Sequence, residues 1–236
     1  MANTGKLYLI PAPLGEGGAH ALPRYVIDIL HGLDVFIAER AKTARRFIKE
    51  TEPPKPFSEM VFYELGKHTP PEEYALFLQD AENGRDIGLL SEAGCPGVAD
   101  PGAVIVRAAH QKGIEVVPLV GPSSILLGLM ASGLNGQHFC FHGYLPPKKP
   151  DLMRELKFLE QRVFKHDQTQ IFIETPYRNM ALIETALNTL SADLLFCIAA
   201  NLSLPTQYVC TRSIGQWRQH PIPDLDKQPA IFLLGK

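Results

Sequence analysis

Residues 90–102 (LSEAGCPGVADPG) constrain the fold more than any other part of the sequence. They follow Ile87–Leu90, a short apolar run that is typical of a fully buried strand. Pro96 and Pro101 each lack an amide donor, and the three glycines of the stretch permit backbone shapes that other residues resist. We therefore interpret this stretch as an irregular loop at the carboxyl end of a buried strand.

A helix is predicted directly after this loop. Asp100 is suited to cap its N-terminus, and Pro101 to occupy the first helical position. From Val104 onward, apolar residues recur at helical spacing. Open α/β sheets bind ligands beyond the carboxyl ends of their strands, so this acid-bearing loop is a candidate ligand site. A plain strand-to-helix connection has the same pattern.

Short apolar runs alternate with helical patterns along most of the chain. The predicted strands are Lys6–Ile10, Val35–Ala38, 60–65, Ile87–Leu90, 115–119, Phe139–Tyr144, 170–173, 194–200, Tyr208–Ser213 and 230–234. The predicted helices include 21–31, Ala41–Glu50, 71–81, 153–164 and one that ends near residue 190. This alternation predicts a parallel sheet. We expect two α/β domains, residues 1–119 and 120–236, with a ligand cleft between them.

Composition and charge exclude several classes of protein. Hydrophobic residues make up 45% of the 236 residues and charged residues 20%, which is ordinary for a globular protein. The net charge of −2 argues against a nucleic-acid coat protein, although a local basic patch can still bind phosphates. Neither a secretory signal nor a run of roughly 20 apolar residues occurs, so we expect a cytoplasmic protein without membrane contact. The four cysteines lack zinc-site spacing, so we expect no metal.

Two groups of basic residues are candidate substrate contacts. Four cations fall at positions i, i+3, i+4 and i+7 of the predicted helix Ala41–Glu50: Lys42, Arg45, Arg46 and Lys49. This spacing places them on one face, which suits a phosphate backbone but is also typical of a solvated helix face. Lys148 and Lys149 form a second basic site in the proline-rich segment 145–150.

A second strand-to-helix turn, VGPSSI, occupies residues 120–125. Ser123 or Ser124 can cap the helix that follows it. The free amides and hydroxyls at this helix start can also hold a carboxylate, such as that of an amino-acid-like ligand. Capping and ligand binding both remain open on the pattern alone.

Five ordered segments of the sequence occur together in one known family. They are KLYLIPAPLGEGG, SEAGCPGVADPG, VVPLVGPSS, FHGYLPPKK and IFIETPYRN. With them the chain resembles the tetrapyrrole methylase superfamily of S-adenosylmethionine-dependent enzymes. Within it, the chain is most similar to the group that methylates a cytidine ribose 2′-hydroxyl of small-subunit ribosomal RNA. The resemblance implies a two-domain α/β enzyme, usually a homodimer, that binds its cofactor folded in the cleft between the domains.

The resemblance also implies which residues contact the cofactor. They are Pro13, Ser91, Glu92, Ala93, Gly94, Cys95, Val98, Ser124, Ile125, Glu174, Pro229 and Ala230. An acceptor such as Glu92 suits the ribose hydroxyls and the amino group, and an apolar slot suits adenine. Glu39, in the acidic loop after the second predicted strand, is the candidate general base that takes the hydroxyl proton. The other interpretation of Glu39 is structural: the dipole of the helix that follows favours a carboxylate near its N-terminus.

Two segments depart from the pattern of this group. Arg40-Ala41-Lys42 follows Glu39 where the group usually has Asp-Thr-Arg, and residues 200–207 (ANLSLPTQ) replace a charged run with neutral residues. Three hypotheses therefore stay open: a ribosomal RNA methyltransferase, a methyltransferase of a tetrapyrrole or another small molecule, and a non-catalytic cofactor-binding homologue.

Overall fold

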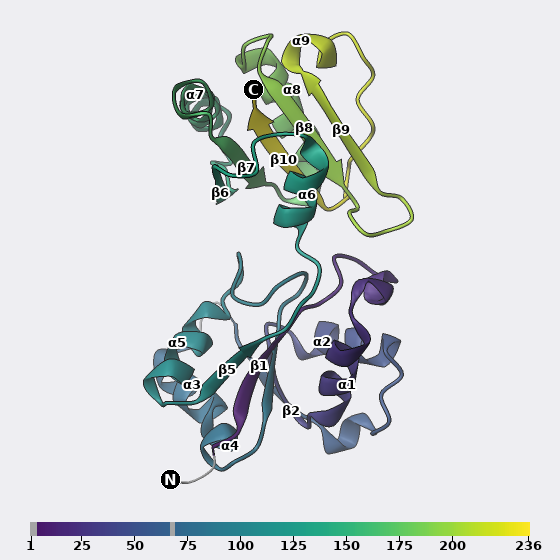
Figure 1. Cartoon of the computed structure of the whole chain (residues 1–236), viewed down its shortest axis with the longest axis vertical. Coiled ribbons are helices and arrows are strands. Elements are labelled where there is room, and N and C mark those ends of the chain that lie inside the picture. Colours follow the sequence, from purple (N-terminus) through teal and green to yellow (C-terminus); the bar gives the residue numbers. More distant parts are fainter. Residues whose placement is uncertain (1–3, 67–68) are drawn as a thin grey trace. The chain divides into compact units, whose positions relative to one another are not determined.

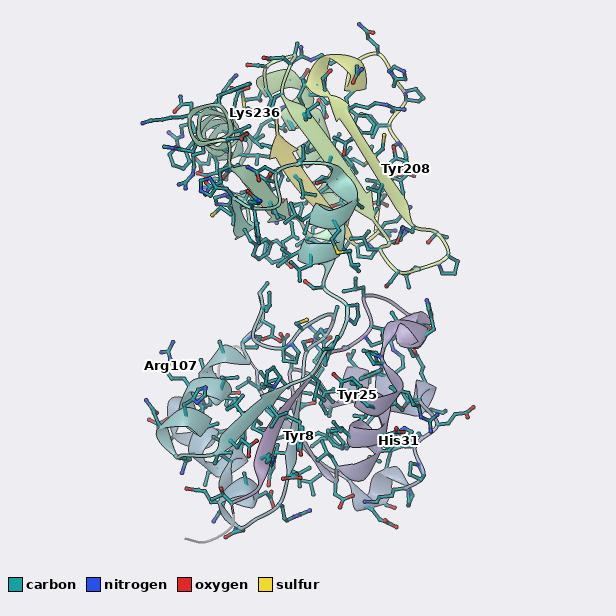
Figure 2. All side chains as sticks on the ribbon, in the orientation of Figure 1. Tyr8, Tyr25, His31, Arg107, Tyr208 and Lys236 are labelled. Atoms are coloured by element: carbon teal, nitrogen blue, oxygen red, sulfur yellow. The ribbon has the colours of Figure 1, made fainter. Side chains whose placement is uncertain are left out.

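The structure is a computed structural model that describes residues 4–66 and 69–236. The chain divides into two compact units, Met1–Ser123 and Ser124–Lys236, and each unit contains a five-stranded sheet (Figure 1). Figure 2 shows the side chains of each unit on the ribbon of Figure 1. Among the described residues, no helix combines the length and apolar character that crossing a membrane requires.

The sheet of the first unit has the order β3-β2-β4-β1-β5, and all of its strand pairs are parallel, as the alternation of strands and helices predicts. Its strands are β1 (Lys6–Ile10), β2 (Val35–Ala38), β3 (Val61–Glu64), β4 (Ile87–Leu90) and β5 (Glu115–Pro118). Its helices are α1 (Arg24–Gly32), α2 (Ala41–Glu50), α3 (Pro71–Phe77), α4 (Gln79–Glu82) and α5 (Ala103–Gln111), with short 3-10 turns η1 (Gly18–Ala21) and η2 (Phe57–Glu59).

Helices cover both faces of this first sheet (Figure 1). Ile10, Phe36 and Leu90 pack in one core cluster with residues of α1 and α2. Leu7 and Leu89 belong to a second cluster, which contains residues of α3, α4 and α5. Successive strand side chains point to opposite faces, so these short strands are apolar throughout rather than alternating.

The sheet of the second unit is mixed, with the order β6-β7-β10-β8-β9. Its strands are β6 (Phe139–Tyr144), β7 (Thr169–Ile173), β8 (Leu195–Ala200), β9 (Tyr208–Ser213) and β10 (Ala230–Gly235). Its helices are α6 (Ser124–Ser132), α7 (Lys149–His166), α8 (Asn179–Thr189) and α9 (Ile214–Trp217), with the 3-10 turn η3 (Pro176–Arg178). Of the pairs in this sheet, β6–β7 is parallel, whereas β10 pairs antiparallel with both β7 and β8, and β8 pairs antiparallel with β9.

The last strand, β10, divides the core of the second unit. Phe232 and Leu234 pack with residues of α7 and α8, including Leu156. On the opposite face, Gly128 of α6 lies so close to the sheet that an added Cβ would be 3.0 Å from Ile231 Cγ2. The second unit is therefore also a sheet between two helical layers.

Several helix boundaries differ from those predicted. The helix expected from residue 21 begins at Arg24, because residues 18–21 form η1 and Pro23 takes the N-cap position. The helix expected at 71–81 is two short helices that join at Leu78. The helix expected at 153–164 begins at Lys149, since a proline in the first turn loses no helical hydrogen bond. Helix α9 was not predicted, although Ser213 and Gln216 form a capping box at its start.

We expect Gly88→Ala to lower the free energy of unfolding by about 1–3 kcal/mol in urea denaturation. A Cβ at this position would lie 2.8 Å from Ile10 Cδ1 and 2.9 Å from Phe36 Cδ1, and both neighbours are fully buried. Gly32→Ala is the matched control, because its Cβ would meet nothing within 4 Å. Equal losses for the two variants would contradict this account of the sheet centre.

Candidate functional site

In the first unit, the loop after β4 is joined to the loop after β1 by a backbone pair. Ala12 N–H donates to Gly94 O at 2.9 Å, and Gly94 N–H donates to Ala12 O at 3.0 Å. Ser91 is 8% exposed, and its hydroxyl donates to the same Gly94 oxygen at 2.8 Å. Gly94 has φ +74°, which L-residues rarely adopt, so a glycine is needed at this turn.

Asp100 orders the second half of the loop. Its Oδ1 accepts the Gly97 N–H at 2.6 Å and the Gly102 N–H at 2.8 Å. Burial raises the pKa of this carboxyl, although the two backbone donors act in the opposite direction. The predicted roles of Asp100 as N-cap and of Pro101 as first helical residue are wrong. Helix α5 begins at Ala103 with Gly102 at the N-cap position, and Asp100 accepts from amides on both sides of it in the loop.

The loop after β5 reaches the same edge of the first sheet. Cys95 Sγ lies 3.6 Å from the carbonyl oxygen of Pro122, and burial raises the pKa of this thiol. Gly121 approaches the loop after β1 so closely that a Cβ there would lie 2.2 Å from Pro11 Cβ. The protonated, half-buried thiol is suited to packing rather than to nucleophilic chemistry.

These loops leave the sheet at a topological switch point. The helix that follows β1 is α1 and the helix that follows β4 is α5, and the two belong to core clusters on opposite faces. The connections from these neighbouring strands therefore diverge at their carboxyl ends. Open α/β sheets bind ligands in the crevice at such a point.

Seven predicted cofactor residues lie on the two joined loops. They are Pro13, Ser91, Glu92, Ala93, Gly94, Cys95 and Val98. Pro13 and Gly94 are buried, Glu92 is half-buried, and Val98 is 47% exposed. The first unit thus brings these residues together at one sheet edge, with one carboxylate and several peptide groups among them.

The other predicted cofactor residues belong to the second unit. Ser124 and Ile125 begin α6, and both are half-buried. Pro229 precedes β10, which Ala230 begins, and the Pro229 carbonyl accepts the Asn201 N–H at 3.0 Å. Their contact with a cofactor stays a prediction.

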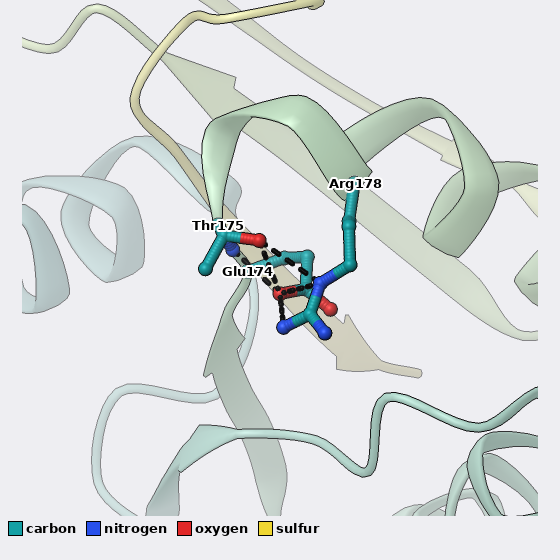
Figure 3. Close-up of polar contacts among 3 residues, drawn as sticks. All are labelled: Glu174, Thr175 and Arg178. Atoms are coloured by element: carbon teal, nitrogen blue, oxygen red, sulfur yellow. Dashed lines mark hydrogen bonds and ion pairs between the residues drawn. The ribbon is translucent and has the colours of Figure 1, made fainter.

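Glu174 follows β7 and is held by donors from its own turn (Figure 3). Its side chain is 3% exposed, and its Oε1 accepts the Thr175 N–H at 2.5 Å and the Thr175 hydroxyl at 3.1 Å. The same oxygen accepts Arg178 Nε at 3.0 Å and Nη2 at 2.5 Å. This buried carboxylate therefore closes the strand-to-helix turn, and its predicted cofactor contact stays untested.

Glu64 accepts a hydrogen bond from the first residue of α2. Its Oε1 accepts the Ala41 N–H at 2.8 Å from the end of β3, which lies beside β2. Glu39 is half-buried between β2 and α2. Sequence reasoning missed Glu64, although an acid at the end of a predicted neighbouring strand was the available signal. Glu64 therefore accepts the Ala41 N–H, and the helix N-terminal role considered for Glu39 stays a prediction.

The cations of α2 share an exposed face, as predicted, opposite the buried Phe47 and Ile48. The Arg45 guanidinium lies over the Phe62 ring, 4.7 Å from its centroid, and Arg46 lies 3.9 Å from Glu16. Lys148 and Lys149 are exposed at the start of α7, so the two predicted basic sites belong to different units.

Side chains of the neutral segment 200–207 form hydrogen bonds within the segment and to Gln228. Asn201 is 8% exposed, and its Nδ2 donates to Gln228 Oε1 at 2.7 Å. Gln207 Oε1 accepts the Ser203 N–H at 2.9 Å. Asn201 and Ser203 both have positive φ, at 50° and 66°. The uncharged residues therefore support an ordered turn.

The described part of the chain holds no group of three or more His, Cys, Asp or Glu side chains suited to a metal ion.

The chain is similar to known proteins along most of its length. The sequence profile of the family described as "Tetrapyrrole (Corrin/Porphyrin) Methylases" matches residues 6–217. The "Ribosomal RNA small subunit methyltransferase I" of Pasteurella multocida is 27% identical over 216 residues, which are 92% of this chain and 73% of that protein. The Bacillus subtilis protein of the same name is 33% identical over 177 residues, 75% of this chain and 57% of that protein.

Solved structures confirm the predicted fold class. The methyltransferase CobJ has a TM-score of 0.65 at 18% identity, with 99% of this chain and 95% of that chain covered. The cobalt precorrin-4 methyltransferase CbiF has a TM-score of 0.61 at 14% identity, with 98% and 94% covered. A uroporphyrin-III C-methyltransferase from Thermus thermophilus, complexed with S-adenosyl homocysteine, has a TM-score of 0.57 at 16% identity, with 98% of each chain covered.

Removing the Asp100 carboxylate leaves two loop amides without their acceptor. We expect Asp100→Ala to lower the free energy of unfolding by about 1–3 kcal/mol, and Asp100→Asn to lower it less because its amide oxygen can still accept. Asp28→Ala, which removes an exposed ion pair with Arg24, is the control and costs at most about 1 kcal/mol. An Asp100→Ala protein as stable as wild type in urea would refute the ordering role.

Proposed function

The chain belongs to the tetrapyrrole methylase family, and from this premise we propose that it transfers a methyl group from S-adenosylmethionine to small-subunit ribosomal RNA. Within this RNA, we propose that the methyl acceptor is a ribose 2′-hydroxyl. One observation carries the proposal: relatives named ribosomal RNA small subunit methyltransferase I are 26–33% identical to it, over as much as 98% of the chain.

The chemistry of the first unit suits this cofactor. The joined loops combine buried Pro13 and Gly94 with the half-buried carboxylate of Glu92. Apolar walls with a few polar groups suit adenine, and a carboxylate suits the ribose hydroxyls or the amino group. When bound, S-adenosylmethionine would supply a methyl group that its positively charged sulfur makes electrophilic.

The residues of the chain would act mainly by positioning. Ser91 and Asp100 hold the loop backbone before any ligand arrives, which lowers the ordering cost of binding. A fixed loop also favours in-line approach of the acceptor hydroxyl, which is a large source of rate acceleration. We assign Glu39 as the general base that takes the hydroxyl proton. Contacts from Ser124, Ile125, Glu174, Pro229 and Ala230 complete the proposed cofactor site.

The proposed RNA contacts are the exposed cations of both units. Lys42, Arg45, Arg46 and Lys49 present a stripe at helical spacing, and Lys148 and Lys149 add a site at the start of α7. Such cations bind phosphates without reading sequence, so they suit a structured ribosomal substrate. We propose that the enzyme works as a homodimer, as the resemblance implies, and that it works in the cytoplasm.

A second candidate is methyl transfer to a small molecule. The neutral segment 200–207 favours it, because the ribosomal RNA group usually has a charged run there. Two of the similar solved structures are methyltransferases named for uroporphyrin-III and cobalt precorrin-4, at 19% and 14% identity. At that identity the similarity concerns the fold alone, so these names do not support this candidate.

The deciding experiment measures transfer of labelled methyl groups from S-adenosylmethionine to isolated small ribosomal subunits. We expect label in subunits from cells that lack this protein and none in wild-type subunits, whose site is already methylated. Nuclease digestion then locates the label on ribose or base. Cofactor binding without labelled RNA would favour a small-molecule acceptor, and cofactor binding without turnover on any acceptor would favour the non-catalytic homologue.

Glu92 tests the cofactor site itself. We expect Glu92→Ala to weaken S-adenosylmethionine binding at least about tenfold in calorimetry, because a charged hydrogen-bond acceptor is lost. Glu82→Ala is the control, since Glu82 of α4 is an exposed carboxylate of the same unit outside the joined loops. Unchanged affinity in the Glu92→Ala protein would remove Glu92 from the site.

A further inference from the structure

The second unit has a groove that none of the predicted site residues lines. It lies between α7 and the C-terminal end of α8, with a volume of about 590 Å³. Its lining residues are Met153, Arg154, Lys157, Phe158, Gln161, Asn188 and Thr189. No carboxylate is among them, although α7 carries Asp151, Glu155 and Glu160. The lining thus combines two apolar side chains with two cations and three neutral polar side chains.

Two exposed apolar side chains line the groove. Phe158 is 49% exposed and Met153 is 41% exposed, whereas Leu152, Leu156 and Leu159 form the buried face of α7. The Arg162 guanidinium lies 5.8 Å from the centroid of the Phe158 ring. This cation lies over the ring, and a partly exposed aromatic ring is a surface on which any nucleobase can stack.

Two cations are held at the groove by carboxylates outside its lining. Arg154 pairs with Asp151, and Lys157 Nζ lies 2.7 Å from Glu160 Oε2. Glu160 is 6% exposed, and its other oxygen accepts the Ser191 N–H at 2.6 Å. The Arg154 and Lys157 side chains are 80% and 46% exposed. The cations therefore face solvent while one of their partners is turned inward, which suits an anionic ligand.

Three neutral polar side chains complete the lining. Gln161 and Asn188 are exposed amides, each able both to donate and to accept a hydrogen bond. Thr189 Oγ1 is buried and has no hydrogen-bond partner among the described residues. Amides next to a stacking ring are suited to the edges of an unpaired base.

We propose that this groove binds a single-stranded segment of RNA, with a base stacked on Phe158 and adjacent phosphates against Arg154 and Lys157. The inference rests on the proposed RNA substrate, and it adds a second region of contact on the second unit. An exposed ring, two solvent-facing cations, two amides and no lining carboxylate are the combination that single-stranded nucleic acid uses.

The test is fluorescence anisotropy of a short labelled single-stranded RNA with the full-length protein, titrated at several salt concentrations. We expect Phe158→Ala to raise Kd about tenfold, because the stacking surface is lost. We expect Arg154→Gln and Lys157→Gln to raise Kd as well, and each to reduce the slope of log affinity against log salt by about 0.7.

Two matched control variants lie on the same helix outside the groove lining. Phe164→Ala removes a ring that is 43% exposed, and Lys165→Gln removes an exposed cation. Both are expected to keep the wild-type affinity and salt slope. Unfolding midpoints and S-adenosylmethionine affinity are measured for every variant, so that a loss of folding is recognised.

The outcomes separate this inference from the proposed function. Methylation of ribosomal RNA together with unchanged RNA affinity in Phe158→Ala, or equal losses in Phe164→Ala, would overturn the groove alone. A wild-type protein that binds S-adenosylmethionine but neither binds the short RNA nor methylates small ribosomal subunits would overturn both proposals. A Phe158→Ala protein with unchanged RNA affinity but a smaller sedimentation coefficient would make the groove a contact between copies of the chain, which also overturns RNA binding there.

Discussion

The backbone pair between Ala12 and Gly94 is the interaction on which the candidate site depends. It joins the loops that leave two neighbouring strands, β1 and β4, whose following helices cover opposite faces of the sheet. Without it the two loops would diverge, since each continues toward a different layer. The pair also requires the positive φ of Gly94, so one glycine links the local backbone to the position of every residue on the loop.

Carboxylates near the strand ends serve mainly to order the backbone. Asp100 accepts two loop amides, Glu64 accepts the first amide of α2, and Glu174 accepts donors from its own turn. Each satisfies peptide groups that regular structure leaves unpaired where a strand or a helix ends. An acid at a strand end is therefore weak support for catalysis by itself.

Positive charge of the second unit lies on α7 rather than in the segment 200–207. Residues 200–207 use Asn201 and Gln207 to hold an ordered loop rather than to present charge. Solvent-facing cations occur instead along α7, from Lys148 and Lys149 at its start to Lys157 in the groove. The proposed groove would thus give this unit its own contribution to RNA binding.

The sequence by itself determined the elements and the exposure of their faces. Ala41–Glu50, Val35–Ala38 and Ile87–Leu90 have the predicted bounds, because periodicity and apolar runs are local properties. Only the tertiary structure decided which polar groups meet. The partner of Ala41 comes from β3, and the groove combines residues of α7 and α8 that are about 30 positions apart. Asp100 accepts from both Gly97 and Gly102, and the folded loop decides that these amides, rather than a helix beginning at Pro101, surround its carboxylate.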